Sequence, residues 1–127
     1  MWNLLLVAAG GATGAVMRYL LGAQAMRALG TGWPYGTLIA NVLGGLLMGT
    51  LAGVLAYRGG ADQERWRLLL GVGVLGGFTT FSAYSLEVAL MLERREWTSA
   101  AAYSLGSVVL SVGALFVGLL LMRRVLA

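Results

Sequence analysis

Three hydroxyl side chains recur at a regular spacing near the C-terminal end of the chain. Tyr103, Ser107 and Ser111 follow one another at intervals of four residues, which places them on one face of a helix over roughly 12 Å. A single serine in such a segment usually bonds the carbonyl four residues before it. Three hydroxyls in one line form a track of donors without negative charge, and this chemistry suits an anion better than a cation.

A single asparagine, Asn41, lies in the middle of a long uncharged segment, with no charged residue within ten positions on either side. Its carboxamide offers two hydrogen-bond donors and one acceptor. Two roles fit this position. One is an interhelical hydrogen bond, worth about 0.6–2 kcal/mol, and the other is contact with a passing ion.

The run GGFTTFSAYS, residues 76–85, interrupts another apolar segment with residues that favour a smooth helix poorly. Gly76-Gly77 costs about 2 kcal/mol of helix propensity relative to two alanines. Thr79 and Thr80 are β-branched, and their hydroxyls can bond exposed backbone groups. We predict a helix break near Gly76–Thr80. Because no acid lies nearby, the carbonyls freed by this break would suit a small monovalent cation such as Na⁺.

Four more side chains near these segments could take part in ion chemistry. Phe81 and Tyr84 share a helix face, and the positive edges of their rings could face an anion, although aromatic residues at this spacing usually serve packing. Arg18 either extends to the membrane interface or raises the local potential for an anion. Glu87, the only acid away from the predicted loops, could relay protons, pair with Arg18 or lie at the interface.

Apolar helices must position these residues. The chain is 59% hydrophobic and 11% charged, with a mean hydropathy of +0.82. A soluble domain has about 25% charged residues, so the composition indicates an integral, all-α membrane protein. The uncharged runs predict one domain, residues 1–127, with four membrane-spanning helices. Their approximate ranges are 2–26, 34–57, 66–93 (broken near 76–80) and 97–123.

Several classes of function are excluded by residue types that the sequence lacks. It has no cysteine and no histidine, which removes disulfides, thiolate metal sites and the commonest proton shuttle. All nine positive charges are arginines, and they form no basic patch interleaved with aromatic residues, so nucleic acid is not an expected partner. We also expect no cleavable signal peptide, because the first segment lacks a basic leader and a small-residue cleavage site.

Orientation in the membrane is weakly determined. One side carries five arginines, and the other carries three, or four if a residue within the first helix is included. The two sets are Arg58, Arg65, Arg67, Arg123 and Arg124, and Arg27, Arg94 and Arg95 with Arg18. This near balance permits insertion in both orientations and hence an antiparallel homodimer; the alternative is that one or two charges fix the topology.

Glycines at four-residue spacing indicate close helix packing, either within the chain or between chains. The pairs are Gly10 and Gly14, Gly45 and Gly49, Gly49 and Gly53, and Gly73 and Gly77. Four short, tightly packed helices leave little room for a central lumen. A transport path would therefore lie between subunits or along grooves.

Three segments together resemble the CrcB/Fluc family of fluoride channels. They are GGATGAVMRY (10–19), GTLIANVLGGLLMG (36–49) and GGFTTFSAYS (76–85), and the resemblance covers essentially the whole chain. It implies a passive, highly selective fluoride channel, not an enzyme, that exports F⁻ across the cell inner membrane for fluoride resistance. It also implies a dual-topology, antiparallel homodimer with two pores and a structural Na⁺ at its centre.

The resemblance also implies individual roles. Backbone carbonyls of Gly76 and Thr79 from both subunits would hold the Na⁺. Asn41 corresponds to the pore asparagine at the end of an aqueous vestibule. The remaining correspondences are Phe81 and Tyr84 (pore aromatic pair), Tyr103, Ser107 and Ser111 with Thr37 (polar track), Glu87 (beside the track) and Arg18 (first motif). The second aromatic position is usually Phe, so the added hydroxyl of Tyr84 leaves its contact with the ion open.

Two other functions remain as alternatives. A proton-coupled transporter similar to the small multidrug resistance family would need a carboxylate deep in the membrane. That family has it in the first helix, where this chain has Arg18, so Glu87 is the sole candidate here. A membrane assembly subunit without transport activity would need only the glycine contacts.

Overall fold

The computed structural model describes residues 2–58 and 63–126, and the described chain is helical apart from its connections. The elements are α1 (Trp2–Leu29), α2 (Tyr35–Arg58), α3 (Gln63–Trp66), η1 (Arg67–Leu75), α4 (Gly76–Phe78), α5 (Phe81–Glu93) and α6 (Trp97–Leu126). Four helical stretches are long and apolar enough to cross a membrane: α1, α2, the composite segment Gln63–Glu93, and α6. The predicted all-α membrane architecture is confirmed at this level.

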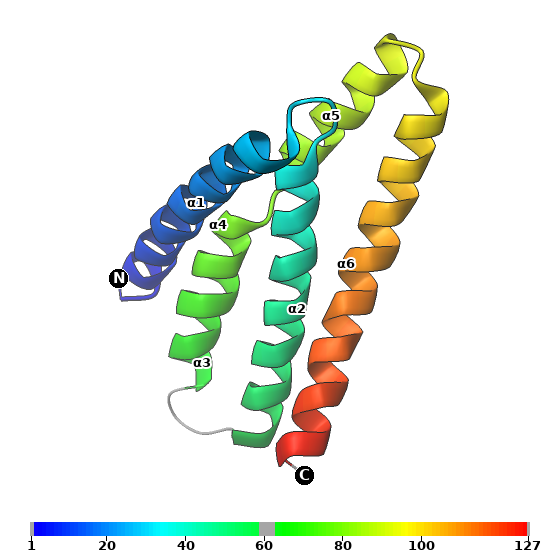
Figure 1. Ribbon diagram of the computed structural model, residues 1–127. Coiled ribbons are helices and arrows are strands. Elements are labelled where there is room, and N and C mark those ends of the chain that lie inside the picture. Colours follow the sequence, from blue (N-terminus) through cyan, green and yellow to red (C-terminus); the bar gives the residue numbers. More distant parts are fainter. Residues whose placement is uncertain (1, 59–62, 127) are drawn as a thin grey trace.

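The helices form two packed pairs (Figure 1). Helix α1 lies along η1 and α4, whereas α2 lies along α6. Helices α5 and α6 form a hairpin that extends past the end of α1 at the top of the view. In this view the C marker lies at the bottom and the N marker lies at the left, at the lower end of α1, whereas the α1–α2 connection and the α5–α6 turn lie in the upper part. The count of arginines on the two sides of the membrane assumes this arrangement of connections and chain ends.

Glycines allow the backbones of these pairs to approach closely. A Cβ atom at Gly10 would lie 2.5 Å from the carbonyl oxygen of Leu69, and one at Gly45 would lie 2.6 Å from that of Ser111. Real Cβ atoms essentially never show contacts under 3.0 Å, so neither position accepts a side chain without movement. These glycines serve packing within the chain, which is one of the two interpretations of their spacing.

The third membrane segment is interrupted at Thr79 and Thr80, within the predicted range. Both residues are extended, with ψ angles of 159° and 125°, and α5 begins at Phe81. The two glycines before them stay helical in α4, so the break falls after the glycine pair and on the two threonines. The preceding turns, η1, are π-helical, which the sequence did not predict.

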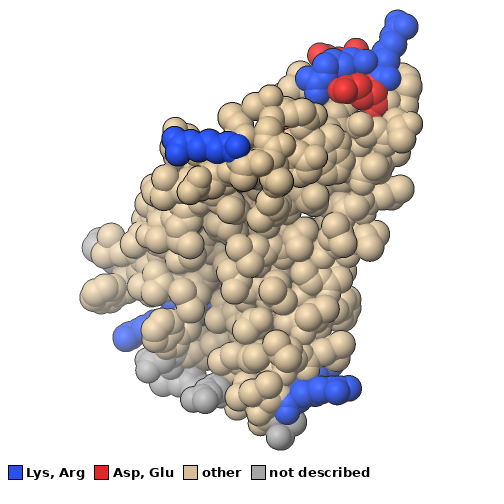
Figure 2. Space-filling view, in the orientation of Figure 1, with Lys and Arg blue, Asp and Glu red and all other residues tan. Residues whose placement is uncertain are grey.

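Charged side chains lie toward the two ends of the molecule (Figure 2). The face between them shows no charged side chain in this view. Many large apolar side chains of the described chain are exposed. An apolar band of this kind matches the hydrocarbon core of a bilayer.

Candidate functional site

The break in the third segment is held by Asn41 of α2. Its Oδ1 accepts a hydrogen bond from the Thr80 N–H at 2.8 Å, and its Nδ2 donates to the Thr80 carbonyl at 3.0 Å. The interhelical hydrogen bond expected for this asparagine is therefore present, and it is made twice to one residue. One Nδ2–H of Asn41 is not used in this pair.

Hydroxyl groups of the two threonines satisfy other backbone groups at the break. The Thr80 Oγ1 accepts from the Ala83 N–H at 3.2 Å and so caps the start of α5. The Thr79 Oγ1 donates to the Leu75 carbonyl at 2.9 Å. The prediction that these hydroxyls would bond backbone groups freed by the break is confirmed for Thr80. It does not hold for Thr79, because the Leu75 carbonyl already accepts the Thr79 N–H.

Arg18 of α1 also contacts the third segment. Its Nε donates to the carbonyl of Gly77 at 3.2 Å, and the side chain is partly buried. In a continuous helix this carbonyl would accept from the N–H of Phe81. The guanidinium therefore brings a positive charge next to the break.

A cavity of about 410 Å³, called here the break cavity, lies beside the interrupted helix. Among the residues singled out in the sequence, those that line it include Asn41, Thr79, Phe81, Tyr84, Ser107 and Ser111. The rings of Phe81 and Tyr84 lie 5.4 Å apart with planes tilted by 44°. None of the described residues that line this cavity is charged, so its polar groups are neutral.

Two hydroxyls in the break cavity lack protein partners. The Oγ atoms of Ser107 and Ser111 are buried and have no hydrogen-bond partner within residues 2–58 and 63–126. Most buried polar side-chain atoms are hydrogen-bonded, and an unsatisfied one costs roughly 1–3 kcal/mol. Two such donors facing one cavity are suited to an acceptor that enters from outside the chain.

Tyr103, the third member of the hydroxyl track, is placed differently. It is fully buried, and its hydroxyl donates to Oε1 of Glu87 at 3.0 Å. Its ring lies between two others, with centroids 5.4 Å from Tyr84 and 5.2 Å from Trp33, the latter edge-on at 79°. Tyr103 thus connects the break cavity to the residues around Glu87.

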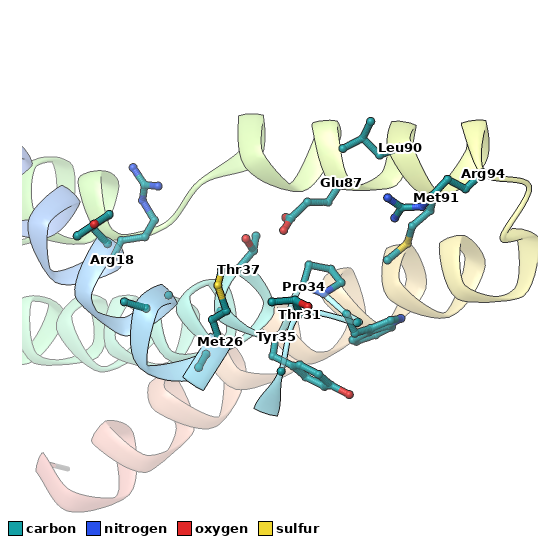
Figure 3. A pocket seen from close by; sticks show the side chains of 18 residues that line it. Arg18, Met26, Thr31, Pro34, Tyr35, Thr37, Glu87, Leu90, Met91 and Arg94 are labelled. Carbon is teal, nitrogen blue, oxygen red and sulfur yellow. The ribbon is translucent and has the colours of Figure 1, made fainter. Parts of the chain in front are cut away.

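A second cavity of about 570 Å³, called here the rim cavity, opens on the side of the α1–α2 connection (Figure 3). Arg18, Thr37, Glu87 and Arg94 line it, and Figure 3 shows Thr37 and Glu87 projecting into the same space. No ion pair joins Glu87 to Arg18, and both belong to the described chain; Glu87 is bonded to Tyr103 instead. The option that Glu87 pairs with Arg18 is therefore wrong.

The structure thus divides the predicted residues between two cavities. Asn41, the aromatic pair and the two serines line the break cavity, while Arg18, Thr37 and Glu87 line the rim cavity. Tyr103 lies between the groups, and Gly76 lines neither. Within residues 2–58 and 63–126 no cluster of three acidic, His or Cys side chains could hold a metal ion.

The family model for CrcB-like protein, Camphor Resistance (CrcB), matches residues 5–119 of this chain. The chain belongs to the CrcB-like family. A protein of Phenylobacterium zucineum (strain HLK1) named fluoride-specific ion channel FluC is 76% identical over 100% of both chains. Proteins of the same name from Caulobacter sp. (strain K31) and Caulobacter vibrioides (strain NA1000 / CB15N) are 65% and 61% identical over 98% of both chains.

Membership of the CrcB-like family confirms the resemblance drawn from the three motifs. These relatives are named as channels, so the prediction that the chain is not an enzyme is confirmed, and the four apolar helices make it a multi-pass membrane protein. One neighbour of the site in this CrcB-like chain was not predicted from the sequence: Trp33, whose ring packs edge-on against Tyr103. Its contact with Tyr103 depends on the conformation of the α1–α2 connection, which no spacing reveals.

Proposed function

We propose that this chain forms a passive, highly selective fluoride channel that exports F⁻ across the cell inner membrane and so provides fluoride resistance. The observation that carries the proposal is the break cavity, where neutral donors and aromatic edges converge around two unbonded buried hydroxyls. Relatives up to 76% identical over their whole length bear the name fluoride-specific ion channel.

The chemistry of the break cavity suits fluoride. This ion is small, strongly hydrated and a good hydrogen-bond acceptor, so a path must replace its water with donors that release it again. The hydroxyls of Ser107 and Ser111 can donate without first breaking a bond to the described protein. Since no charged residue of the described chain lines this cavity, no fixed cation traps the ion there.

The proposed path runs from the rim cavity to the break cavity. Arg18 raises the potential at the entrance, where Thr37 also lies, and Ser107 and Ser111 offer donors in the break cavity. Between them the proposed path passes Tyr103, which is fully buried and lines neither cavity. Glu87 holds the hydroxyl of Tyr103 in place as its acceptor. The ring edges of Phe81 and Tyr84 and the free N–H of Asn41 complete the polar lining.

A second, inverted copy of the chain would complete the site and give two pores per dimer. Phe81, which lines the break cavity, is 77% exposed in the single chain, so a second chain packed over it would enclose that side of the cavity. The near balance of arginines between the two sides favours insertion both ways. The chain has no cysteine, so one introduced at Arg95 reports orientation. Dual topology predicts that a membrane-impermeant thiol reagent labels part of this cysteine in intact cells and the rest only after the cells are opened.

A structural Na⁺ at the dimer centre fits the backbone of the break. The N–H groups that a continuous helix would give to the carbonyls of Gly76 and Thr79 are those of Thr80 and Ala83, and both donate to side chains instead. These two carbonyls from each subunit would hold the ion. When bound, Na⁺ supplies a positive charge at the centre of the assembly, where protein carbonyls alone would repel one another.

Fluoride efflux from loaded liposomes tests the proposal. Purified protein should release fluoride, measured with an electrode, without a proton gradient and with little chloride flux. Proton-coupled cation transport that is lost in Glu87→Gln would instead identify a multidrug-type transporter. No ion flux at all, together with a silent Phe81→Ile, would identify an assembly subunit without transport activity.

A further inference from the structure

The carboxamide of Asn41 acts on the conformation of Thr80. Thr80 is extended, with φ −152° and ψ 125°, and Asn41 bonds both its N–H and its carbonyl, at 2.8 and 3.0 Å. The N–H and carbonyl of one extended residue point to the same side of the chain, as in the hydrogen-bonded pairs of a β-ladder. The carboxamide therefore takes the place of a neighbouring strand and fixes Thr80 outside the helix.

This pair changes which carbonyls of the break remain available. In a continuous helix the Thr80 N–H would donate to the carbonyl of Gly76. Here the Thr80 N–H donates to Asn41 Oδ1 instead. In the same way, the Ala83 N–H donates to the Thr80 hydroxyl rather than to the carbonyl of Thr79. The carbonyl between them, that of Gly77, is bonded by Arg18. The side chains thus leave the carbonyls of Gly76 and Thr79 without their helical donors, while Gly77 is bonded to the protein.

We propose that Asn41 is a positioning residue for the central cation: by holding Thr80 extended, it keeps the Gly76 carbonyl available to Na⁺. Its remaining N–H belongs to the break cavity, so one carboxamide serves the sodium site and the fluoride path together. The inference rests on the proposed Na⁺ site and goes beyond it, because it assigns control of cation affinity to a side chain that does not bind the cation.

Removal of the carboxamide lets the Thr80 N–H return to Gly76. Na⁺ would then have to displace a hydrogen bond before it binds, and the loss of one buried hydrogen bond corresponds to about a tenfold change in affinity. This return requires Thr79, whose ψ is 159°, to turn toward the helical region. The Ala83 N–H stays with the Thr80 hydroxyl, so the carbonyl of Thr79 does not gain its helical donor. Replacement of Asn41 should therefore weaken Na⁺ binding without abolishing it.

The experiment measures Na⁺ binding without fluoride transport. Full-length protein in detergent is titrated with NaCl against N-methylglucamine chloride at constant ionic strength, and thermal unfolding gives the Na⁺ midpoint. Asn41→Leu should raise this midpoint about tenfold. Thr50→Ala is the matched control on α2, because its hydroxyl bonds only Leu46 of the same helix.

Each result has one meaning. If Na⁺ does not change the unfolding temperature of the wild type, the proposed Na⁺ site is wrong. Fluoride efflux is a separate measurement and can still be intact. If the wild type responds and Asn41→Leu responds at the same concentration, the inference about Asn41 is wrong and the Na⁺ site stands. Should Asn41→Leu fail to fold, Asn41→Ser, whose side chain is too short to reach Thr80, carries the same expectation.

Discussion

The hydroxyl of Tyr103 donates a 3.0 Å hydrogen bond to the carboxylate of Glu87 and thereby joins α6 to α5. Tyr103 is fully enclosed, and its ring is fixed by Trp33 on one side and Tyr84 on the other. A buried phenol needs an acceptor, and Glu87 supplies it from the wall of the rim cavity. The only acid among the predicted site residues therefore positions the track.

Replacement of Glu87 separates this role from proton exchange. Glu87→Gln keeps a carbonyl oxygen that can accept from Tyr103, so fluoride efflux should stay within about threefold of wild type. Glu87→Leu leaves the buried hydroxyl without this acceptor, which costs about 1–3 kcal/mol of stability and should lower efflux further. Efflux and thermal unfolding are measured on both. Equal loss in the two variants would mean that the charge, rather than the hydrogen bond, is needed.

Phe81→Ile should lower fluoride efflux at least about tenfold with little effect on folding. The ring is 77% exposed in the single chain, so its loss removes few intrachain contacts, while the aromatic edge toward the break cavity disappears. Phe116→Ile on α6 is the matched control, since Phe116 is also exposed and lines neither cavity. Comparable efflux from both variants would show that Phe81 is not part of the ion path.

Tyr84→Phe should keep nearly wild-type fluoride efflux. The Tyr84 hydroxyl donates to the Ser104 carbonyl of α6 at 3.4 Å, a long distance for such a bond, so it contributes little stability. The ring edge is retained in the variant. Fluoride efflux from liposomes measures the effect. Loss of efflux in Tyr84→Phe would show that fluoride passage requires the phenol hydroxyl.

The location of the break could be predicted from local chemistry, but its detailed form could not. Two glycines followed by two threonines indicated an interruption, because both residue types disfavour helix by mechanisms that act within a few residues. The glycines nevertheless remain helical in α4, since Gly77 fits against Gly11 of α1 and Arg18 bonds its carbonyl. Contacts between distant segments therefore decided which residues leave the helix.

The hydroxyl track shows a similar limit. Its spacing correctly placed Ser107 and Ser111 toward one cavity, because helix geometry alone fixes which side chains share a face. That Tyr103 turns to Glu87, and that Asn41 bonds both backbone groups of Thr80, depends on how α5 and α2 meet their neighbours. The π-helical η1 likewise has no local signature in the sequence.

Gly49→Ala should destabilise the chain by about 1–3 kcal/mol. The added methyl would overlap the Leu115 carbonyl of α6, a backbone atom that cannot move by a simple side-chain rotation. Gly113→Ala is the matched control, because a Cβ there meets nothing within 4 Å in the single chain. It should be neutral, or stabilising by up to about 1 kcal/mol through helix propensity. Thermal unfolding in detergent compares the two. Destabilisation by Gly113→Ala alone would place the critical glycine contact between subunits.

Arg95→Gly should stabilise the α5–α6 turn by about 1 kcal/mol. Arg95 has a φ of 58°, and the N–H groups of Arg95 and Glu96 bond the carbonyls of Leu92 and Met91, the pattern of a helix end that favours glycine. Arg95→Ala makes the same change in charge but keeps the side-chain carbon, so it serves as the control and should show no gain. The two variants are compared by thermal unfolding. An equal shift in both would show that charge at the turn, rather than backbone conformation, limits its stability.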